Sequence, residues 1–340
     1  MGAEKSLIIF DLKKFNIGLS KLEVVTFLKK SIKHFAFELK NNFLFVHFLE
    51  SDIDLDFFQK NIKNLAQVNL CFYLLSKSEN FEDFLSNPIS KVSSFWLRSF
   101  FRVSNPSFRV TLKHTPLNFA SELANSLDNS LGLGKVDLRN PDIEFYCLNL
   151  NSTYYLGLVL YKDVEDYSQR YPHLRPVAHP TSMIPSLART LVNLAGASTS
   201  FLDPFCGSGG FLIEGGILGV KPIGVDCEQK MIYASRMNLV HYGIDSFELF
   251  KMDAFDWNKE VECIVTDVPY GKNSVLKQDL SDFVEKFLRH FEPLTSTIIF
   301  ACPKSVPVNS LLLDLDFHLV DSFELYVHKS LTRVIYVLKK

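Results

Sequence analysis

Residues 201–219 read Phe-Leu-Asp-Pro-Phe-Cys-Gly-Ser-Gly-Gly-Phe-Leu-Ile-Glu-Gly-Gly-Ile-Leu-Gly, and this stretch decides the fold. Two apolar residues lead into Asp203, a glycine-rich turn follows, and apolar residues with helical spacing come next, so the pattern predicts a strand, a tight loop and a helix. Glycines let a ligand approach the backbone closely, and the start of a helix offers unpaired N–H groups. The stretch indicates either a site for a nucleotide-like ligand or an ordinary strand-to-helix turn of another α/β protein.

The residues around the glycines narrow the choice of ligand. The dinucleotide fingerprint requires a third glycine where this chain has Leu212, which weakens a nicotinamide or flavin interpretation. No Gly-Lys-Ser or Gly-Lys-Thr follows, which excludes a Walker phosphate loop. The remaining pattern, Asp-Pro-Phe-Cys-Gly-Ser-Gly-Gly, resembles the first motif of S-adenosylmethionine-dependent methyltransferases. That resemblance implies S-adenosylmethionine as the cofactor, with contacts from Asp203, Pro204, Phe205, Cys206, Gly207 and Gly209.

Length and composition set the broad class of the protein. The chain has 340 residues, which suits two or three domains. No apolar run approaches the roughly 20 residues that span a bilayer, and the N-terminus lacks the pattern of a secretory signal. The six cysteines are scattered without a Cys-x-x-Cys pair, which argues against a disulfide framework or a zinc site. We therefore expect a cytoplasmic protein with no membrane contact and no bound metal.

The charge of the chain is unevenly distributed. The net charge is only −2, but between residues 91 and 139 seven basic residues outnumber three acidic ones. Local positive charge is expected where one module contacts the phosphates of a nucleic acid, and chance clustering on a solvated surface is the alternative. The candidate RNA-binding residues in this segment are Arg98, Arg102, Arg109, Lys113 and Arg139.

Residues 1–79 are expected to form a first domain. Apolar alternation and helical spacing predict the element order βαββαβ, which is ferredoxin-like. Such an order identifies a fold and not an activity. The expected strands cover residues 6–12, 35–39, 43–49 and 68–75, and the expected helices cover residues 21–34 and 54–63.

Residues 80–165 are expected to form a second, α+β domain. Residues 107–113 alternate like a strand, residues 117–131 have the spacing of an amphipathic helix, and strands are expected over residues 135–145 and 154–161. The runs Phe-Arg-Val, Val-Asp-Leu-Arg-Asn-Pro-Asp and Tyr-Leu-Gly-Leu resemble the THUMP domain, an RNA-binding module of tRNA-modifying enzymes. The resemblance implies recognition of the acceptor end of tRNA. A small domain used only for packing is the alternative.

Residues 166–180 contain three prolines and little periodicity, which predicts a linker of restricted conformation. Arg170 and Arg175 are candidates for contact with an RNA backbone, and solvated linker charges are the alternative. The run His-Pro-Thr-Ser-Met-Ile-Pro that follows resembles the segment before the first methyltransferase motif in THUMP-containing guanine methyltransferases. By that resemblance, the methionine end of the cofactor is lined by His179, Thr181 and Met183.

Residues 181–340 alternate between strand and helix patterns, which predicts a Rossmann-like domain with a seven-stranded sheet. One expected strand ends in Asp226, where a carboxylate can accept both ribose hydroxyls of an adenosine, and Cys227 follows directly. In the resembled family, a residue that binds the adenine amino group stands where this chain has Asp253 and Ala254.

The run Asp-Val-Pro-Tyr at residues 267–270 resembles the Asp-Pro-Pro-Tyr motif of amino-methyltransferases, which act on exocyclic amines of bases. A guanine N2 amine is a poor nucleophile because its lone pair is delocalised, so two acceptors must hold its N–H groups and aim the lone pair. By the resemblance, Asp267 is one acceptor, the carbonyl of Val268 is the other, Pro269 completes the motif, and Tyr270 stacks on the base. Val268 replaces the usual proline, so we expect a looser loop and slower turnover. A plain strand-to-helix turn is the alternative.

These motifs together resemble THUMP-containing tRNA methyltransferases, and most closely the archaeal and eukaryotic enzymes that modify guanosine 10. The resemblance implies transfer of one or two methyl groups from S-adenosylmethionine to the N2 amine of that guanosine in tRNA. Three alternatives stay open: the same chemistry at guanosine 6, a tRNA-binding protein with a degraded site, and an amino-methyltransferase that acts on DNA or protein.

Two surface features remain. The basic run at residues 329–333 ends in Arg333 and either faces RNA or forms a tight surface turn. Members of the resembled family often work with a small zinc-binding activator protein that pairs with an edge strand of the methyltransferase sheet. Phe247, Leu249 and Phe250 make the third strand of this domain a candidate for such pairing, although burial of that edge within the chain is the commoner explanation.

Overall fold

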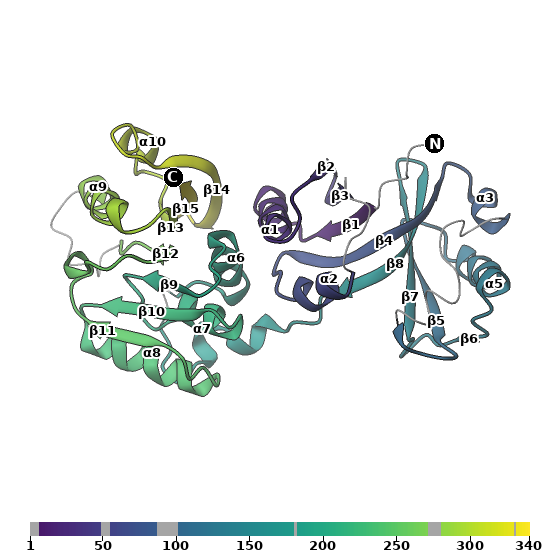
Figure 1. Ribbon diagram of the computed structural model, residues 1–340, viewed down its shortest axis with the longest axis horizontal. Helices are drawn as coiled ribbons and strands as arrows, with labels where there is room; N and C mark the ends of the chain where they lie inside the picture. Colours follow the sequence, from purple (N-terminus) through teal and green to yellow (C-terminus); the bar gives the residue numbers. More distant parts are fainter. Residues whose placement is uncertain (1–6, 49–54, 87–100, 180–181, 271–279, 330) are drawn as a thin grey trace. The chain divides into compact units, whose positions relative to one another are not determined.

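The computed structural model describes residues 7–48, 55–86, 101–179, 182–270, 280–329 and 331–340. The chain forms two compact units, each with its own sheet (Figure 1). Unit 1 consists of Met1–Lys14, Ile32–Lys63 and Val68–Val164, and unit 2 consists of Phe15–Ser31, Asn64–Gln67 and Glu165–Lys340. No helix in the described ranges is long and apolar enough to cross a membrane.

The elements of residues 7–78 follow the expected order βαββαβ along the chain, but the first of the two helices belongs to unit 2. The first half of unit 1 contains β1 (Leu7–Leu12), β2 (Phe35–Lys40), β3 (Phe43–Phe48), α2 (Leu55–Ile62) and β4 (Val68–Ser78). β1 lies between β3 and β4 and is antiparallel to both, and β2 pairs with β3. The turn between β2 and β3 places Asn41 at a φ of +55°, which asparagine tolerates better than most residues.

The second half of unit 1 continues the same sheet. It contains α3 (Phe81–Ser86), β5 (Ser107–Lys113), α5 (Phe119–Leu131), β6 (Lys135–Val136), β7 (Ile143–Leu150) and β8 (Thr153–Lys162). β8 pairs antiparallel with both β4 and β7, so one eight-stranded sheet runs in the order β2-β3-β1-β4-β8-β7-β5-β6. The boundary expected near residue 79 is therefore not a break in the sheet.

The strand expected over residues 135–145 is divided into β6 and β7. Asp137 accepts hydrogen bonds from the backbone N–H groups of Arg139 and Asn140 at 2.9 and 3.0 Å. These bonds fold the chain into a turn, as an aspartate side chain commonly does two residues before a bend. The alternation of apolar residues across this stretch does not reveal the interruption.

Unit 2 contains a seven-stranded sheet. Its strands are β9 (Ser200–Asp203), β10 (Lys221–Asp226), β11 (Glu248–Lys251), β12 (Ile264–Asp267), β13 (Thr297–Pro303), β14 (His318–His328) and β15 (Leu331–Lys339). They are connected by α6 (Pro185–Ala195), α7 (Gly210–Ile217), α8 (Gln229–His241), α9 (Leu280–Phe291), α10 (Val308–Leu311) and short 3-10 turns that include Ala254–Asp256 and Glu292–Leu294. The strand order is β11-β10-β9-β12-β13-β15-β14, and β15 is antiparallel to both of its neighbours.

The directions of these strands bring distant residues to one edge. β9, β10 and β12 run parallel and therefore end at the same side of the sheet, here called the carboxyl edge. Because β15 is antiparallel to β13, its first residues and not its last lie at the carboxyl edge.

The helix expected over residues 21–34 is α1 (Ile17–Lys29), and its packing assigns it to unit 2. The fully buried side chain of Glu23 accepts hydrogen bonds from the backbone N–H groups of Ala66 and Gln67 at 3.0 and 2.9 Å. It also accepts one from the side chain of Asn193, on α6, at 2.7 Å. Since a buried carboxylate is costly without such partners, this hydrogen-bond set holds α1 against α6.

The junction between β4 and β8 supplies a test of the unit 1 sheet. A Cβ atom at Gly157 would lie 2.2 Å from a ring carbon of Phe72 and 2.7 Å from the carbonyl oxygen of Tyr73. We expect Gly157→Ala to destabilise the protein by about 1–3 kcal/mol, because the backbone cannot move away cheaply. Chemical denaturation measures the change. The control Asn125→Ala, at an exposed position of α5, should stay within about 0.5 kcal/mol of the wild type. Equal stabilities for both variants would contradict the close packing.

Candidate active site

The carboxyl edge of unit 2 contains the position at which the order of strands reverses. β10 and β11 lie on one side of β9, and β12 and β13 lie on the other. Open α/β sheets bind their ligands outside the carboxyl ends of the strands at such a reversal. The candidate site is therefore the edge where β9, β10 and β12 end.

Asp203, the last residue of β9, is buried at this point. Its Oδ1 accepts a hydrogen bond from Thr266 Oγ1, on β12, at 2.7 Å and one from the N–H of Phe205 at 3.2 Å. Burial raises the pKa of Asp203 to about 7, with smaller contributions from the negative charges of Asp226 and Asp267. Asp203 thus joins two strands and begins the glycine loop.

Asp226, the last residue of β10, fixes the glycine loop from the other side. Its two carboxylate oxygens accept hydrogen bonds from the N–H of Gly207 at 3.0 Å and from the N–H of Glu228 at 2.9 Å. Gly207 and Gly209 have φ values of +51° and +85°, which other residues rarely adopt. A Cβ atom at Gly207 would meet nothing within 4 Å, so the space above this turn is open. An open, glycine-lined turn beside a carboxylate fits an adenosine-containing cofactor.

The other expected cofactor residues have different environments. Pro204, Cys206, Met183 and Ala254 are buried. Phe205 packs against Phe283 and Phe287, while the side chain of Asp253 accepts a hydrogen bond from the N–H of Phe255 at 2.9 Å. His179 is partly exposed, Cys227 is exposed, and Thr181 lies outside the described residues. Of these, Asp253 and His179 present polar groups at the surface of unit 2.

Asp267 ends β12, and its two carboxylate oxygens have different surroundings. Its Oδ2 lies 3.0 Å from Arg333 Nη2 and 3.5 Å from the hydroxyl of Tyr270, which in turn accepts a hydrogen bond from Arg333 Nε at 2.6 Å. Its Oδ1 is buried and has no hydrogen-bond partner among the described residues. Burial raises the pKa of Asp267 to about 6, against the opposing effect of Arg333. Oδ1 can accept a hydrogen bond from a ligand.

Val268 makes a contact that proline could not make. Its N–H donates a hydrogen bond to the carbonyl of Ala301, on β13, at 3.0 Å, and its side chain is buried. Proline has no N–H to donate. This bond continues the pairing of β12 with β13 and fixes the junction between Val268 and β12. The expectation of a looser loop and slower turnover stays a prediction. Pro269 beside it is partly buried.

The basic residues of unit 1 divide into exposed and paired ones. Arg102, Lys113 and Arg139 are exposed. Arg109 forms an ion pair with Glu144 at 2.5 Å and leaves 22% of its side chain exposed. Arg98 lies outside the described residues. Within the described part of unit 1, Arg102, Lys113 and Arg139 are therefore the members of this group whose exposure makes them accessible to an RNA backbone.

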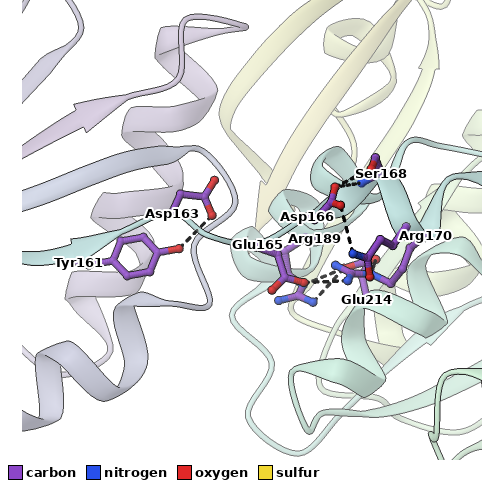
Figure 2. Close-up of polar contacts among 9 residues, drawn as sticks. Tyr161, Asp163, Glu165, Asp166, Ser168, Arg170, Arg189 and Glu214 are labelled. Atoms are coloured by element: carbon purple, nitrogen blue, oxygen red, sulfur yellow. Dashed lines mark hydrogen bonds and ion pairs between the residues drawn. The ribbon is translucent and has the colours of Figure 1, made fainter. Parts of the chain in front are cut away.

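Arg170 and Arg175 are buried, which corrects their interpretation as RNA contacts. Arg170 Nε and Nη2 contact the two oxygens of Glu214 at 2.8 and 3.3 Å, and Arg189 donates to the same carboxylate at 3.0 Å (Figure 2). Glu214 lies on α7 and is completely buried, so it requires these cations. Arg175 donates from Nε to the carbonyl of Arg170, and burial lowers its pKa. Arg170 therefore stabilises unit 2 through Glu214, and Arg175 is held inside unit 2 by its bond to Arg170.

Arg333 also differs from its expected role. The sequence predicts a basic loop facing RNA or a tight surface turn, but Arg333 lies in β15 with 13% of its side chain exposed and points to Asp267 and Tyr270.

The sequence gives only weak indications that two further residues belong to the site. Thr266 is a polar residue within an apolar strand, and Asn238 is a buried amide on α8 that donates to the carbonyl of Ser208 at 2.9 Å. No group of three or more potential metal ligands occurs in the part of the chain that the structure describes.

Comparisons with known proteins agree with this geometry. The family model for the RMKL-like methyltransferase domain matches residues 172–333. A tRNA (guanine(10)-N2)-dimethyltransferase of Methanothermobacter thermautotrophicus is 38% identical over 220 residues, which are 61% of this chain and 64% of that protein, so the match spans less than two thirds of its length. A probable tRNA (guanine(10)-N2)-dimethyltransferase of Methanothermococcus thermolithotrophicus is 37% identical over 166 residues, 45% of this chain and 98% of that protein. The crystal structure of TrmN from Thermus thermophilus matches 98% of this chain and 99% of that chain at 19% identity with a TM-score of 0.51, which shows a similar fold.

The raised pKa of Asp203 predicts a pH dependence of stability. Its value of about 7 in the folded protein exceeds the ~3.9 of an unfolded aspartate, so the stability that the protonated carboxyl provides is complete at low pH and is lost as the pH rises toward 7. Asn cannot ionise. We expect the free energy of unfolding of Asp203→Asn, relative to the wild type, to increase by about 2 kcal/mol between pH 5 and pH 8. Denaturation at both pH values tests this, and the exposed control Asp256→Asn should show no such change.

Proposed function

Because the chain belongs to the family of tRNA (guanine(10)-N2)-dimethyltransferases, we propose that it transfers methyl groups from S-adenosylmethionine to the N2 amine of guanosine 10 in tRNA. The observation that carries the proposal is Oδ1 of Asp267, which has no hydrogen-bond partner among the described residues and lies at the carboxyl edge, as does the loop that Asp203 and Asp226 hold. An acceptor for an amine at the same edge as a fitting cofactor loop supports this chemistry.

The cofactor supplies a methyl group on a positively charged sulfur. We assign its adenosine to the carboxylate of Asp226, which would accept the ribose hydroxyls, and to Asp253, near the adenine. The glycine turn allows the cofactor to approach the backbone, and His179 and Met183 would border its methionine end. The open space above Gly207 supports this assignment.

Asp267 and Val268 act on the nucleophile. Oδ1 of Asp267 accepts one N–H of the guanine amine and the carbonyl of Val268 accepts the other, which aims the nitrogen lone pair at the methyl group. Pro269 fixes its own φ between Val268 and Tyr270, whose ring stacks on the base. S-Adenosylmethionine would supply the methyl group for the new N–C bond, and the electron pair of its C–S bond would remain on sulfur. The amine then gives one proton to the carboxylate of Asp267.

We propose that unit 1 binds the tRNA. Residues 80–165 would act as the THUMP domain and residues 1–79 as a ferredoxin-like extension of the same sheet, with residues 166–180 as the linker to the methyltransferase domain, 181–340. The exposed side chains of Arg102, Lys113 and Arg139 support contact with phosphates. tRNA modification of this kind would take place in the cytoplasm.

We also propose the edge strand β11 as the attachment point for a small zinc-binding activator protein. β11 is the last strand on its side of the sheet. Phe247, Leu249 and Phe250 are partly buried against the core of unit 2, so pairing would use the backbone of the strand. Co-purification of this chain with such a protein, abolished in the variant Leu249→Pro, tests the proposal.

The function is tested by methyl transfer from labelled cofactor to an unmodified tRNA transcript, with the product mapped by nuclease digestion and mass spectrometry. We expect label on guanosine 10, and no label when that base is replaced by adenosine. Label on guanosine 6 would support the alternative site of modification. Absence of transfer despite binding of both tRNA and cofactor would support a binding protein.

The variant Asp267→Ala tests whether Asp267 takes part in the methyl transfer itself. We expect kcat to fall by about 10²-fold or more, because the variant has no oriented acceptor for the reacting amine, while the Kd for S-adenosylhomocysteine changes less than about twofold. Calorimetric titration measures that Kd. Loss of cofactor binding as well would show that Asp267 is mainly structural.

The exposed basic residues predict a salt effect. The double variant Lys113→Ala/Arg139→Ala should weaken binding of all tRNA sequences equally. A plot of the logarithm of the association constant against the logarithm of the salt concentration should also become less steep, by about 1 for each phosphate that the variant no longer neutralises. Arg109→Ala is the comparison, since its side chain is engaged with Glu144 and should change the slope less. Filter binding at several salt concentrations measures the slopes. An unchanged slope in the double variant would exclude these two residues as phosphate-binding groups.

A further inference from the structure

We propose that Arg333 is a positioning residue that holds Asp267 and Tyr270 in their working orientation, with one oxygen of Asp267 left free for the guanine amine. The inference rests on the proposed function and deepens it. It comes from the geometry of β15, since Arg333 lies far along the chain from the Asp-Val-Pro-Tyr run.

The backbone of Arg333 is fixed on both sides. In the register of the sheet it is opposite Pro303 of β13 and opposite Leu325 of β14. The adjacent N–H of Lys304 donates to the carbonyl of Thr332 at 2.9 Å. Because β15 begins at the carboxyl edge, a residue held in this way presents its side chain where β12 ends.

The side chain of Arg333 closes a triangle of contacts. Nη2 lies 3.0 Å from Asp267 Oδ2, Nε lies 2.6 Å from the hydroxyl of Tyr270, and that hydroxyl lies 3.5 Å from the same Oδ2. A guanidinium group is planar and its donors have a fixed angle, so one side chain sets the orientation of both partners. The contacts use Oδ2 and the tyrosine hydroxyl, and they leave Oδ1 for another donor.

Arg333 also supplies the charge that the site requires. Among the residues that the structure describes, the ionisable groups that interact with Asp267 include Arg333, Tyr270, Asp203 and Cys302, and of these four Arg333 is the cation. An ionised carboxyl is a stronger acceptor for the amine than a protonated one, and only the ionised form can take the proton that the amine releases. Burial raises the pKa of Asp267 and Arg333 lowers it, so removal of Arg333 extends the protonated range of this carboxyl to higher pH.

The experiment compares Arg333→Gln, Arg333→Lys and the control Arg289→Gln in methyl transfer to tRNA. Arg289 lies on α9 with 47% of its side chain exposed, in an ion pair with Glu285. Four quantities are measured: kcat as a function of pH, KM for tRNA, the Kd for S-adenosylhomocysteine and the thermal unfolding temperature.

For Arg333→Gln we expect kcat at pH 7 to fall about tenfold or more, the acidic limb of the kcat profile to move to higher pH, and the cofactor Kd to change less than about twofold. Arg333→Lys keeps the charge without the planar fork, so its acidic limb should stay near that of the wild type while its kcat remains lowered. The lysine variant also tests the proposal if the glutamine variant does not fold. Arg289→Gln should match the wild type in all four quantities.

Three results would overturn the inference. If the Arg333 variants behave like Arg289→Gln, Arg333 does not position the site. If they raise KM for tRNA with kcat and the pH profile unchanged, Arg333 contacts RNA. If the wild-type protein transfers no methyl group to any tRNA, the proposed function fails and the inference fails with it, which separates that result from the other two.

Discussion

The hydrogen bond from Thr266 Oγ1 to Asp203 Oδ1 joins the two strands between which the order of the unit 2 sheet reverses. The ladder between β9 and β12 contains the pair Ile264–Leu202, which lies before the carboxyl ends of both strands. The side-chain bond therefore connects the strands at the point where the glycine loop and Asp267 emerge. The position of the loop relative to Asp267 depends on this 2.7 Å contact, and so does any reaction that needs both.

The part of the site that could be predicted from the sequence is the part carried by parallel strands. Asp203, Asp226 and Asp267 each end an apolar run, and parallel strands end at one edge, so their order along the chain is enough to bring them together. The glycine loop is equally local, because the positive φ values of Gly207 and Gly209 involve few residues. Such features depend on neighbours in the sequence, and the sequence therefore reveals them.

The arginines could not be placed in the same way, because their surroundings come from distant elements. Arg170 is buried since Glu214, on α7, needs a cation, and Arg333 reaches Asp267 since β15 runs antiparallel. A basic residue in a loop-like stretch looks solvated until its partner is known. The continuous sheet of unit 1 could not be predicted for the same reason, because the pairing of β4 with β8 joins strands that are far apart in the sequence.

Asp203 and Asp267 show how one edge can hold two carboxyl groups with opposite roles. Burial raises the pKa of both, to about 7 and about 6. Burial and, to a smaller extent, the two neighbouring carboxylates Asp226 and Asp267 favour the protonated form of Asp203. The hydrogen bonds donated by Thr266 and by the N–H of Phe205 act in the opposite direction. Asp267 faces Arg333, which favours the ionised form and occupies Oδ2. Environments that shift the pKa values of two carboxyl groups by different amounts are a usual means of assigning different tasks to identical side chains. Among the described residues Oδ1 of Asp267 has no hydrogen-bond partner, which suits Asp267, and not Asp203, to accept a hydrogen bond from an amine.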